Sequence, residues 1–490
     1  MKRMWGNFSE RGRGKGENKF YVKTIALLLV VAILLPHQYV MASGASCGNG
    51  CSTYDIVLIG SEVEGMMLAK AAHKNGLKVL VLDPREKPGG QLIQGQMQVL
   101  DEPNDKRKRS LVQGEMKKLY DGYKSKNIRT HEQFTRYYNQ LIKGIPLRSG
   151  ITIKKVSMGK RDKLKTVDSI TYIAKDKKTY TVKADYWVEN TDHNALTGKL
   201  GVKRIPGVET VYKSKKPDYM AATLMLKFKN VNWPKLHQAV LKDYPLTNVA
   251  KKYGPGTYVD WNYATGFSNV TAKFKPNDSQ LMLRGLNTTY QLNGKVIMNA
   301  FLIFDVDPAN PESVRKAREK AIKEAPRVLQ FLKKNIPGYE HAQLDGFPDY
   351  LYIRDYNRFE TDYIINYEDV MSGKMFWDNV SIGSYPVDLQ GTKSVPKGIT
   401  LGKPDRYGIP LRSFMLKEYE NVIVAGKNVG ATATAYGSVR IMPNTALAAE
   451  TIGIIIAREG KHKRLKQLTP SDFKRIHKYL EYSYRIKVQK

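Results

Sequence analysis

Two short apolar runs flank a helical pattern early in the chain. Residues 54–59 and 77–82 have the length of buried strands, and residues 66–75 between them have helix-forming composition. Gly60 follows the first run and Asp83 follows the second. This order of strand, glycine turn, helix, strand and acid predicts a βαβ unit.

The middle of the chain changes to β-rich patterns. Apolar and polar residues alternate at period two before residue 190, and longer apolar stretches come after residue 218, so both parts are typical of strands. A helical period then covers residues 311–335, with Pro311 near its start. The predicted strands are residues 151–157, 169–174, 179–184, 186–191, 222–228 and 295–304.

The carboxyl end returns to an α/β pattern. Residues 421–426 are typical of a buried strand, and residues 442–458 of an apolar helix rich in small residues. Residues 461–490 form a basic tail with an amphipathic helical pattern that we expect Ser471 to cap. The apolar face of this predicted helix consists of Phe473, Ile476, Leu480 and Tyr484.

Residues 1–42 have the pattern of a targeting segment. Basic residues come first, an apolar run over residues 24–35 follows, and the small residue Ala42 ends the segment. This pattern predicts a secretory signal peptide cleaved after Ala42, with residues 43–53 as a flexible leader. The apolar run is shorter than the roughly 20 residues of a spanning helix. The alternative is an uncleaved N-terminal membrane anchor.

Composition limits the classes of function. The chain has 80 Lys and Arg against 46 Asp and Glu, a net charge of +34, which favours an anionic cell envelope or membrane surface as partner. No recognition motif accompanies this charge, which argues against nucleic acid as a partner. The two cysteines, Cys47 and Cys51, either pair outside the cell or play no part. No cysteine or histidine spacing indicates a metal site.

The glycine turn carries the chemistry of the βαβ unit. Gly60 allows a tight turn, and Gly65 lets the helix approach the strand, so that the helix amino terminus faces a pyrophosphate. Asp83 ends the second strand, where a carboxylate accepts hydrogen bonds from ribose hydroxyls. Glu62 stands where a glycine would let the backbone pass closest to the phosphates. The alternative is an α/β unit that has lost its ligand.

Further segments resemble the bacterial FAD-dependent oxidoreductases, two-domain flavoproteins related to glutathione reductase, over about residues 54–457. Pro88–Gln91 is similar to the family's Gly-Gly turn, and residues 190–192 to its Ala-Thr-Gly strand end. The most specific match is Val424–Lys427 followed by Gly437–Met442. The resemblance implies a non-covalent FAD cofactor, held by Gly60, Ser61, Glu62, Gly65, Asp83, Pro84, Gly90, Gln91, Gly426, Gly437 and Ser438.

The resemblance also implies a fold and a division into domains. The fold class is α/β, with a three-layer, Rossmann-like FAD-binding domain and an inserted β-rich α+β substrate domain. The FAD-binding domain is expected in two parts, residues 54–215 and 396–460, and the substrate domain over residues 216–395. The basic helical tail, residues 461–490, would follow the second part.

Three residues are the predicted catalytic groups: Arg354, Tyr385 and Arg440. Arg440 would either contact an anion or the flavin, or form a salt bridge that fixes its loop. Tyr385 would either donate a phenolic proton or pack in the core. Asp388 is a possible general base, although a turn-capping role is the commoner one for Asp. No cysteine lies near the expected flavin, which excludes disulfide reductase chemistry.

Two functions follow from these observations. The first is an exported FAD-dependent oxidoreductase that acts on an unidentified small molecule. The second is a flavin-poor relative that serves as a basic cell-envelope binding protein, which the net charge of +34 would suit.

Overall fold

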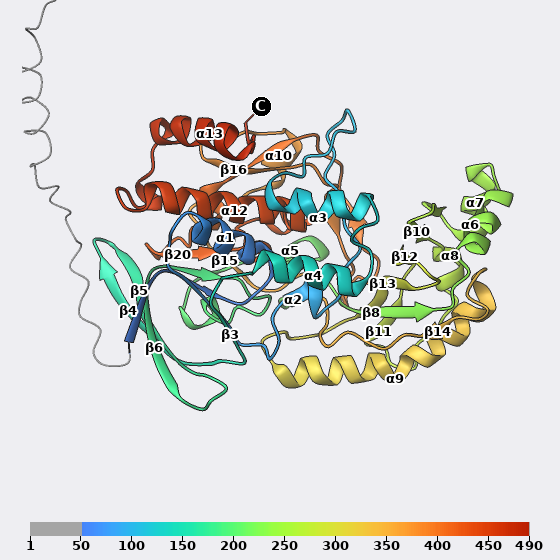
Figure 1. The fold of residues 1–490 in the computed structure, drawn as a ribbon. Helices are drawn as coiled ribbons and strands as arrows, with labels where there is room; N and C mark the ends of the chain where they lie inside the picture. Colours follow the sequence, from blue (N-terminus) through green and yellow to red (C-terminus); the bar gives the residue numbers. More distant parts are fainter. Residues whose placement is uncertain (1–50, 490) are drawn as a thin grey trace, which may run out of the picture. The chain divides into compact units, whose positions relative to one another are not determined.

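A computed structural model describes residues 51–489 and has a seven-stranded sheet built from six strands before residue 190 and one strand near residue 423 (Figure 1). The strand order is β3-β2-β1-β6-β5-β4, and β20 also pairs with β6. Strands β3, β2, β1, β6 and β20 pair in parallel, whereas β4, β5 and β6 pair antiparallel. The bounds are β1 Cys51–Ile59, β2 Val79–Asp83, β3 Leu147–Ser149, β4 Thr152–Arg161, β5 Leu164–Ile173, β6 Thr179–Glu189 and β20 Val422–Val424.

Strand β6 has two different neighbours along one edge. Residues 179–183 pair antiparallel with β5, and residues 187–189 pair in parallel with β20. The two strands predicted over residues 179–184 and 186–191 are therefore one strand, and that division was wrong. The reason is β1, which pairs with β6 from Thr181 to Glu189 and keeps the chain extended between the two parts.

Helices cover the parallel part of this sheet. Helix α12 (Met442–Glu459) lies along α1 (Val63–Lys74) and also contacts α3 (Gly114–Lys124), as Figure 1 shows. Almost all of α12 is buried, which explains why apolar residues are spread around the whole helix. Helices α2 (Gly90–Ile93) and α4 (His131–Leu141) pack against each other and against α1.

Two helix starts differ from the sequence-based expectation. Helix α1 begins at Val63 rather than at residue 66, because the Glu62 carbonyl already accepts a hydrogen bond from the Met66 N–H (3.1 Å). Helix α13 (Pro470–Tyr484) is capped by Thr469 and not by Ser471. Thr469 and Asp472 bond to each other's backbone N–H groups, and proline suits the first helical position, so the helix starts at Pro470.

The second large sheet is antiparallel and lies beside helix α9 (Pro311–Asn335), which has the bounds predicted from sequence (Figure 1). Its order is β14-β8-β13-β12-β10-β9, and β11 also pairs with β13. Helices α6 (Trp233–Lys242), α7 (Leu246–Tyr253) and α8 (Ser268–Thr271) lie at its β9 end. The strand bounds are β8 Ala222–Lys229, β9 Tyr258–Val259, β10 Tyr263–Gly266, β11 Leu281–Leu283, β12 Leu286–Tyr290, β13 Val296–Ile303 and β14 Gln343–Leu344.

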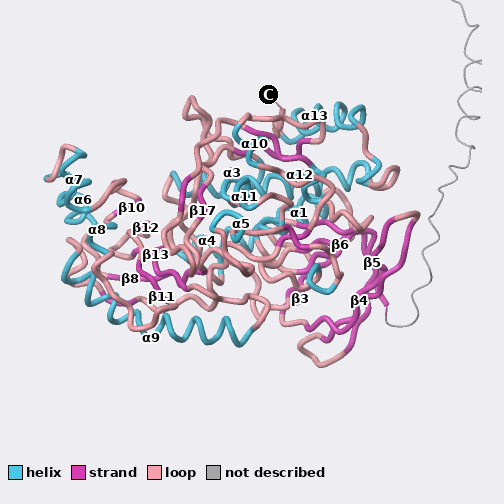
Figure 2. The backbone as a smooth tube through the Cα atoms, turned by 180° about the vertical axis from the view of Figure 1, so that it is seen from behind, coloured by secondary structure: helices cyan, strands magenta, loops and turns pink. Residues whose placement is uncertain are grey.

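Short elements join the two sheets, and Figure 2 shows β17 among them from the opposite side. Three two-stranded ladders are formed by β7 with β15, β16 with β19 and β17 with β18. The parallel sheet covered by helices and the separate β-rich sheet confirm the predicted fold class. The bounds are α5 Glu209–Tyr212, β7 Arg204–Ile205, β15 Arg358–Phe359, α10 Tyr367–Met371, β16 Asn379–Gly383, β17 Asp388–Leu389, β18 Ile399–Thr400, β19 Tyr407–Pro410 and α11 Ala433–Val439.

The predicted signal peptide or anchor, and all of the leader before Cys51, lie outside the described residues. Across residues 51–489, no single helix has both the length and the apolar character of a membrane span. Helices α11 and α12 meet those criteria only as a pair, and they are bent by 83° at their junction.

Candidate functional site

The glycine turn between β1 and α1 is held by Asn190, the residue after β6. Its side-chain amide accepts a hydrogen bond from the Gly65 N–H (3.0 Å) and donates to the carbonyls of Gly60 (3.2 Å) and Glu62 (2.9 Å). A Cβ on Gly65 would lie 2.2 Å from this amide, and Gly60 has φ of +98°. Gly60 is therefore required by its backbone conformation, and Gly65 by the close approach of the Asn190 side chain. The sequence indicated only that Asn190 lies at a strand end. Its hydrogen bonds to the glycine turn could not be predicted, because the fold brings these distant segments together.

Asp83 is fully buried at the end of β2, and both of its carboxylate oxygens have partners within the protein. One oxygen accepts from the Ser61 hydroxyl, and the other from the Arg85 N–H (2.8 Å). The Ser61 hydroxyl also accepts from the Gly89 N–H (3.0 Å). The Gly-Gly turn at residues 89–90 is thus tied to the first glycine turn through Ser61 and Asp83.

The Glu62 side chain points into the protein and is almost fully buried. Its carboxylate lies 2.7 Å from the Arg85 guanidinium and accepts from the Gln91 N–H at 2.8 Å. A Cβ on Gly90 would lie 2.2 Å from the same carboxylate, so the Gly-Gly turn leaves room for Glu62. In this structure an acidic side chain therefore occupies the anion-binding position between the two glycine turns.

Further buried charges surround Gln91. Lys427 donates to the Gln91 side-chain oxygen (3.1 Å), and the Gln91 amide donates to Glu64 (3.3 Å). Burial raises the pKa of Glu64 to about 7, with a further increase from Glu62 and an opposing effect from Lys427. Asp192 lies 3.1 Å from Arg85 and 4.0 Å from Lys427. We call Glu62, Glu64, Arg85, Asp192 and Lys427 the charged cradle.

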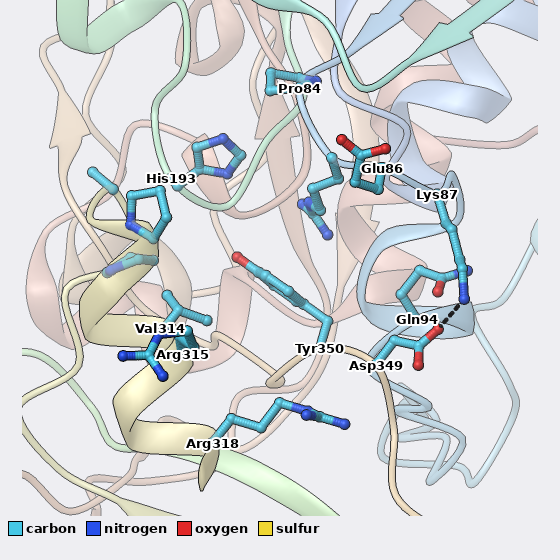
Figure 3. Close-up of a pocket in the computed structure, with 14 residues that line it drawn as sticks. Pro84, Glu86, Lys87, Gln94, His193, Val314, Arg315, Arg318, Asp349 and Tyr350 are labelled. Carbon is cyan, nitrogen blue, oxygen red and sulfur yellow. Dashed lines mark hydrogen bonds and ion pairs between the residues drawn. The ribbon is translucent and has the colours of Figure 1, made fainter. Parts of the chain in front are cut away.

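A first cavity of about 530 Å³ opens beside the end of β2 (Figure 3). Tyr350 lies across it, and the Arg85 guanidinium is 4.6 Å from the centre of the Tyr350 ring. Pro84 lines one side, and Arg315 and Arg318 of helix α9 line another. The position next to β2 suits the adenosine half of a dinucleotide.

A second cavity of about 470 Å³ brings the three predicted catalytic residues together. Arg354 comes before β15, Tyr385 follows β16, and Arg440 ends helix α11. The Tyr385 hydroxyl donates to Asp101 (3.0 Å), and burial raises the pKa of Tyr385 well above its usual value. Arg440 donates to the Asp388 carbonyl (3.3 Å) and lies 3.6 Å from its carboxylate.

The chain from Gly426 to Arg440 links the charged cradle to the second cavity. Gly426 lies beside Glu64 at one end, and Arg440 lines the cavity at the other. The Tyr352 ring also lies between them, with the Lys427 amine 5.6 Å and the Arg354 guanidinium 4.6 Å from its centre.

Gly437 and Ser438 lie against two residues that line the second cavity, Asp388 and Tyr385. A Cβ on Gly437 would lie 2.9 Å from the Asp388 nitrogen, so glycine permits this close approach. The Ser438 hydroxyl donates to the Tyr385 carbonyl (2.5 Å) and shares a hydrogen bond with the Tyr407 hydroxyl (2.7 Å). Their predicted contact with a flavin stays a prediction.

The donors that surround Glu62 suit the pyrophosphate of FAD. Among the described residues, the Nε and Nη1 atoms of buried Arg85 have no hydrogen-bond partner. Unpaired guanidinium donors beside a helix amino terminus are typical of a diphosphate site. Arg85 and Gln91 would hold the phosphates and Asp83 the ribose, in exchange for the bonds that Glu62 and Ser61 make here. The residues therefore fit FAD, with Glu62 as an internal competitor.

The family model for FAD dependent oxidoreductases matches residues 55–480 of the chain. Similar solved structures include a flavoprotein/dehydrogenase from Cytophaga hutchinsonii, with 8% identity, 89% of this chain and 84% of that chain covered, and a TM-score of 0.41. A geranylgeranyl bacteriochlorophyll reductase-like protein from Thermoplasma acidophilum has 9% identity, coverage of 89% and 85%, and a TM-score of 0.39.

The p-nitrophenol 4-monooxygenase from Pseudomonas putida DLL-E4 has 10% identity, coverage of 89% and 87%, and a TM-score of 0.39. The search of curated proteins found no match. The family match extends over most of the chain and includes the glycine turn, Asp83 and Arg440. The chain belongs to the FAD-dependent oxidoreductase family and is an FAD-dependent enzyme.

Proposed function

We propose that the protein is an exported oxidoreductase that binds FAD without a covalent link and acts on a small molecule in the second cavity. The observation that carries this proposal is the convergence of Arg354, Tyr385 and Arg440 on one cavity. That cavity is joined to the charged cradle by the chain from Gly426 to Arg440. Export is supported by the targeting pattern of residues 1–42.

The side chains of the second cavity bind and orient the substrate. FAD, when bound, supplies the oxidation or reduction itself. Arg354 and Arg440 place positive charge beside the substrate, which stabilises negative charge that develops on it. Tyr385 keeps its proton because its pKa is raised by burial and by Asp101, so its hydroxyl serves as a hydrogen-bond donor. Burial also raises the pKa of Asp101, which favours its role as a proton carrier.

The visible spectrum of the purified protein from residue 43 onward tests this proposal. We expect a yellow protein whose flavin appears in the supernatant after acid precipitation. Flavin that stays with the pellet would contradict non-covalent binding. A colourless protein that takes up no added FAD would overturn the proposed oxidoreductase function.

One observation favours the alternative, a flavin-poor protein that binds the anionic cell envelope. The charged cradle already contains three carboxylates against two cations, and an additional diphosphate adds negative charge to this buried site. A colourless protein that sediments with isolated cell envelopes at low salt, but not at high salt, would support this second function.

A further inference from the structure

Three guanidinium groups converge on the second cavity from three parts of the fold. Arg284 lies in the turn between β11 and β12, Arg354 precedes β15, and Arg440 ends α11. Sequence reasoning singled out Arg354 and Arg440 but missed Arg284, because its turn carries no recognisable motif. The convergence is produced only when the β-rich sheet packs against the segment around α11.

Arg354 is almost fully buried, and no carboxylate among residues 51–489 forms an ion pair with it. Its guanidinium donates to the Ala221 carbonyl, the Thr223 hydroxyl (2.7 Å) and the Asn299 side-chain oxygen (3.2 Å), all of which are neutral. Burial lowers the pKa of Arg354 to about 10, and repulsion from the other two arginines contributes to the decrease. A buried charge without a counter-ion costs free energy, so a ligand that supplies an anion would stabilise this arrangement.

The other two arginines also have unused capacity for an anion. Arg284 donates to the Gln390 side-chain oxygen and to the Asn299 carbonyl (3.2 Å), which are neutral acceptors. Within residues 51–489, no ion pair with a carboxylate involves Arg284. Among the same residues, the buried Nε of Arg440 has no hydrogen-bond partner.

Two acids line the cavity, and each already has a partner within it. The Asp388 carboxylate accepts from the Gln390 amide (2.5 Å) and forms an ion pair with Arg440 at 3.6 Å, so it leaves Arg284 and Arg354 without a carboxylate partner among residues 51–489. Asp101 accepts from the Tyr385 hydroxyl, and burial raises the pKa of Asp101, which weakens it as a counter-ion. The cavity therefore has three positively charged arginines against two acidic side chains.

The remaining walls suit a ligand with a flat apolar part. Tyr263, Tyr352 and Tyr385 line the cavity together with Leu286 and Pro386. A volume of about 470 Å³ lies within the usual range of small-molecule sites. Arginine pairs with carboxylates through two parallel hydrogen bonds, so an organic carboxylate would use both the charge and the aromatic walls.

We infer that the second cavity binds a small organic carboxylate as substrate, with its carboxylate held by Arg284, Arg354 and Arg440. This inference rests on the proposed function for its catalytic meaning, but the binding itself can be measured separately. Benzoate is the probe, because it combines one carboxylate with one aromatic ring.

The experiment titrates benzoate into the FAD-loaded protein from residue 43 onward and follows saturation-transfer NMR signals of benzoate and the flavin absorption spectrum. Arg284→Met should weaken benzoate binding by about tenfold or more, the loss expected for one charge-assisted contact. Asp388→Asn should tighten it, a gain that a folding defect would not produce. Arg136→Met is the matched control, because Arg136 is exposed on α4 and is not among the residues that line the cavity.

The outcomes separate the carboxylate site from the proposed function. Benzoate binding that follows this order of variants supports the inference. Equal binding by all variants, or no binding by the unmodified protein, would overturn it. Binding seen only after flavin is removed would also overturn it, because the cavity would then belong to the flavin. A protein that takes up no FAD yet binds benzoate in this order would overturn the oxidoreductase function and leave the carboxylate site standing.

Discussion

The carboxylate of Glu62 competes with the cofactor for the Arg85 guanidinium and the Gln91 N–H. We expect Glu62→Gly to bind FAD more tightly, because a like charge about 4 Å away costs a few kcal/mol at an effective dielectric constant near 20. Quenching of FAD fluorescence on addition of the apoprotein measures the affinity. Glu62→Gln is the matched variant, since it removes the charge and keeps the shape. Unchanged affinity in both variants would show that Glu62 does not oppose the phosphates.

Asp83 is the acceptor expected to hold the ribose of FAD. We expect Asp83→Ala to weaken FAD binding through the loss of two charge-assisted hydrogen bonds, each worth about 1.5–3 kcal/mol. The same change also removes the acceptor for Ser61 and Arg85, so thermal unfolding of the apoprotein must be measured in parallel. Loss of stability with unchanged FAD affinity would assign Asp83 a structural role only.

Because Glu64 titrates near neutrality and lies in the charged cradle, we expect FAD affinity to depend on pH there. Its pKa is raised to about 7, so it is mainly protonated at pH 6 and mainly ionised at pH 8. Because the ionised form repels the pyrophosphate, affinity should fall as pH rises through about 7. Titrations at pH 6 and pH 8 test this, and Glu64→Gln should flatten the difference. An affinity that rises with pH would contradict the assignment.

The spacing of Gly60, Gly65 and Asp83 was sufficient to predict the βαβ unit, because tight turns and close helix packing depend on local sequence. The direction of the Glu62 side chain was not predictable in the same way. It is set by Arg85 and Gln91, which the pairing of β2 with β1 brings next to Glu62. Tyr350, which lies across the first cavity, carried no sequence signal at all.

At the scale of elements, the contact between α1 and the end of β6 depends on a missing side chain. Gly65→Ala would place a Cβ 2.2 Å from the Asn190 amide, which makes three hydrogen bonds to the turn. We expect a loss of unfolding free energy of about 2–4 kcal/mol from overpacking and lost hydrogen bonds, measured by denaturant titration. Gly198→Ala is the control, because its Cβ would meet only Asn194 at 3.7 Å. Equal stability of the two variants would show that Asn190 moves freely.

The hydrophobic periodicity of the sequence predicted the long helix α9 correctly, but it divided strand β6 into two strands. Helix α9 was predicted with its full bounds because Pro311 and the following Pro337 confine the helical pattern. Strand β6 was divided wrongly because its pairing partner changes from β5 to β20, while β1 on the other edge stays the same. Such pairing involves residues more than two hundred positions away, so no local pattern reports it.

At the scale of the whole molecule, the basic tail does not form a separate arm. Phe473, Ile476 and Leu480 of α13 are buried, and the Asn379 amide donates to the Val488 carbonyl (3.0 Å). Part of the tail's charge is matched by the body, as in the ion pair of Lys466 with Asp362 (2.8 Å). The charge that reaches an external partner is therefore smaller than the composition of the tail suggests.

Attachment to the cell surface is the prediction that belongs to this scale. The chain carries a net charge of +34, so an exported protein should be held electrostatically by an anionic envelope. Washing intact cells with 1 M salt shortens the Debye length from about 8 Å to about 3 Å and should release it. Release would support a cleaved, charge-held protein. Retention until detergent is added would instead support an uncleaved anchor at residues 24–35, and a purely cytosolic protein would contradict export.

Strand β20 is synthesised near the end of translation, and this has a consequence for biogenesis. Residues 422–424 complete a sheet whose first strand begins at Cys51, so a ribosome must make most of the chain before the sheet can close. Without its last strand the sheet would stay incomplete during synthesis, which would suit passage of the unfolded chain through a secretion channel. If the protein is exported as proposed, flavin capture would follow translocation, and supply of the free dinucleotide on the far side of the membrane would limit maturation.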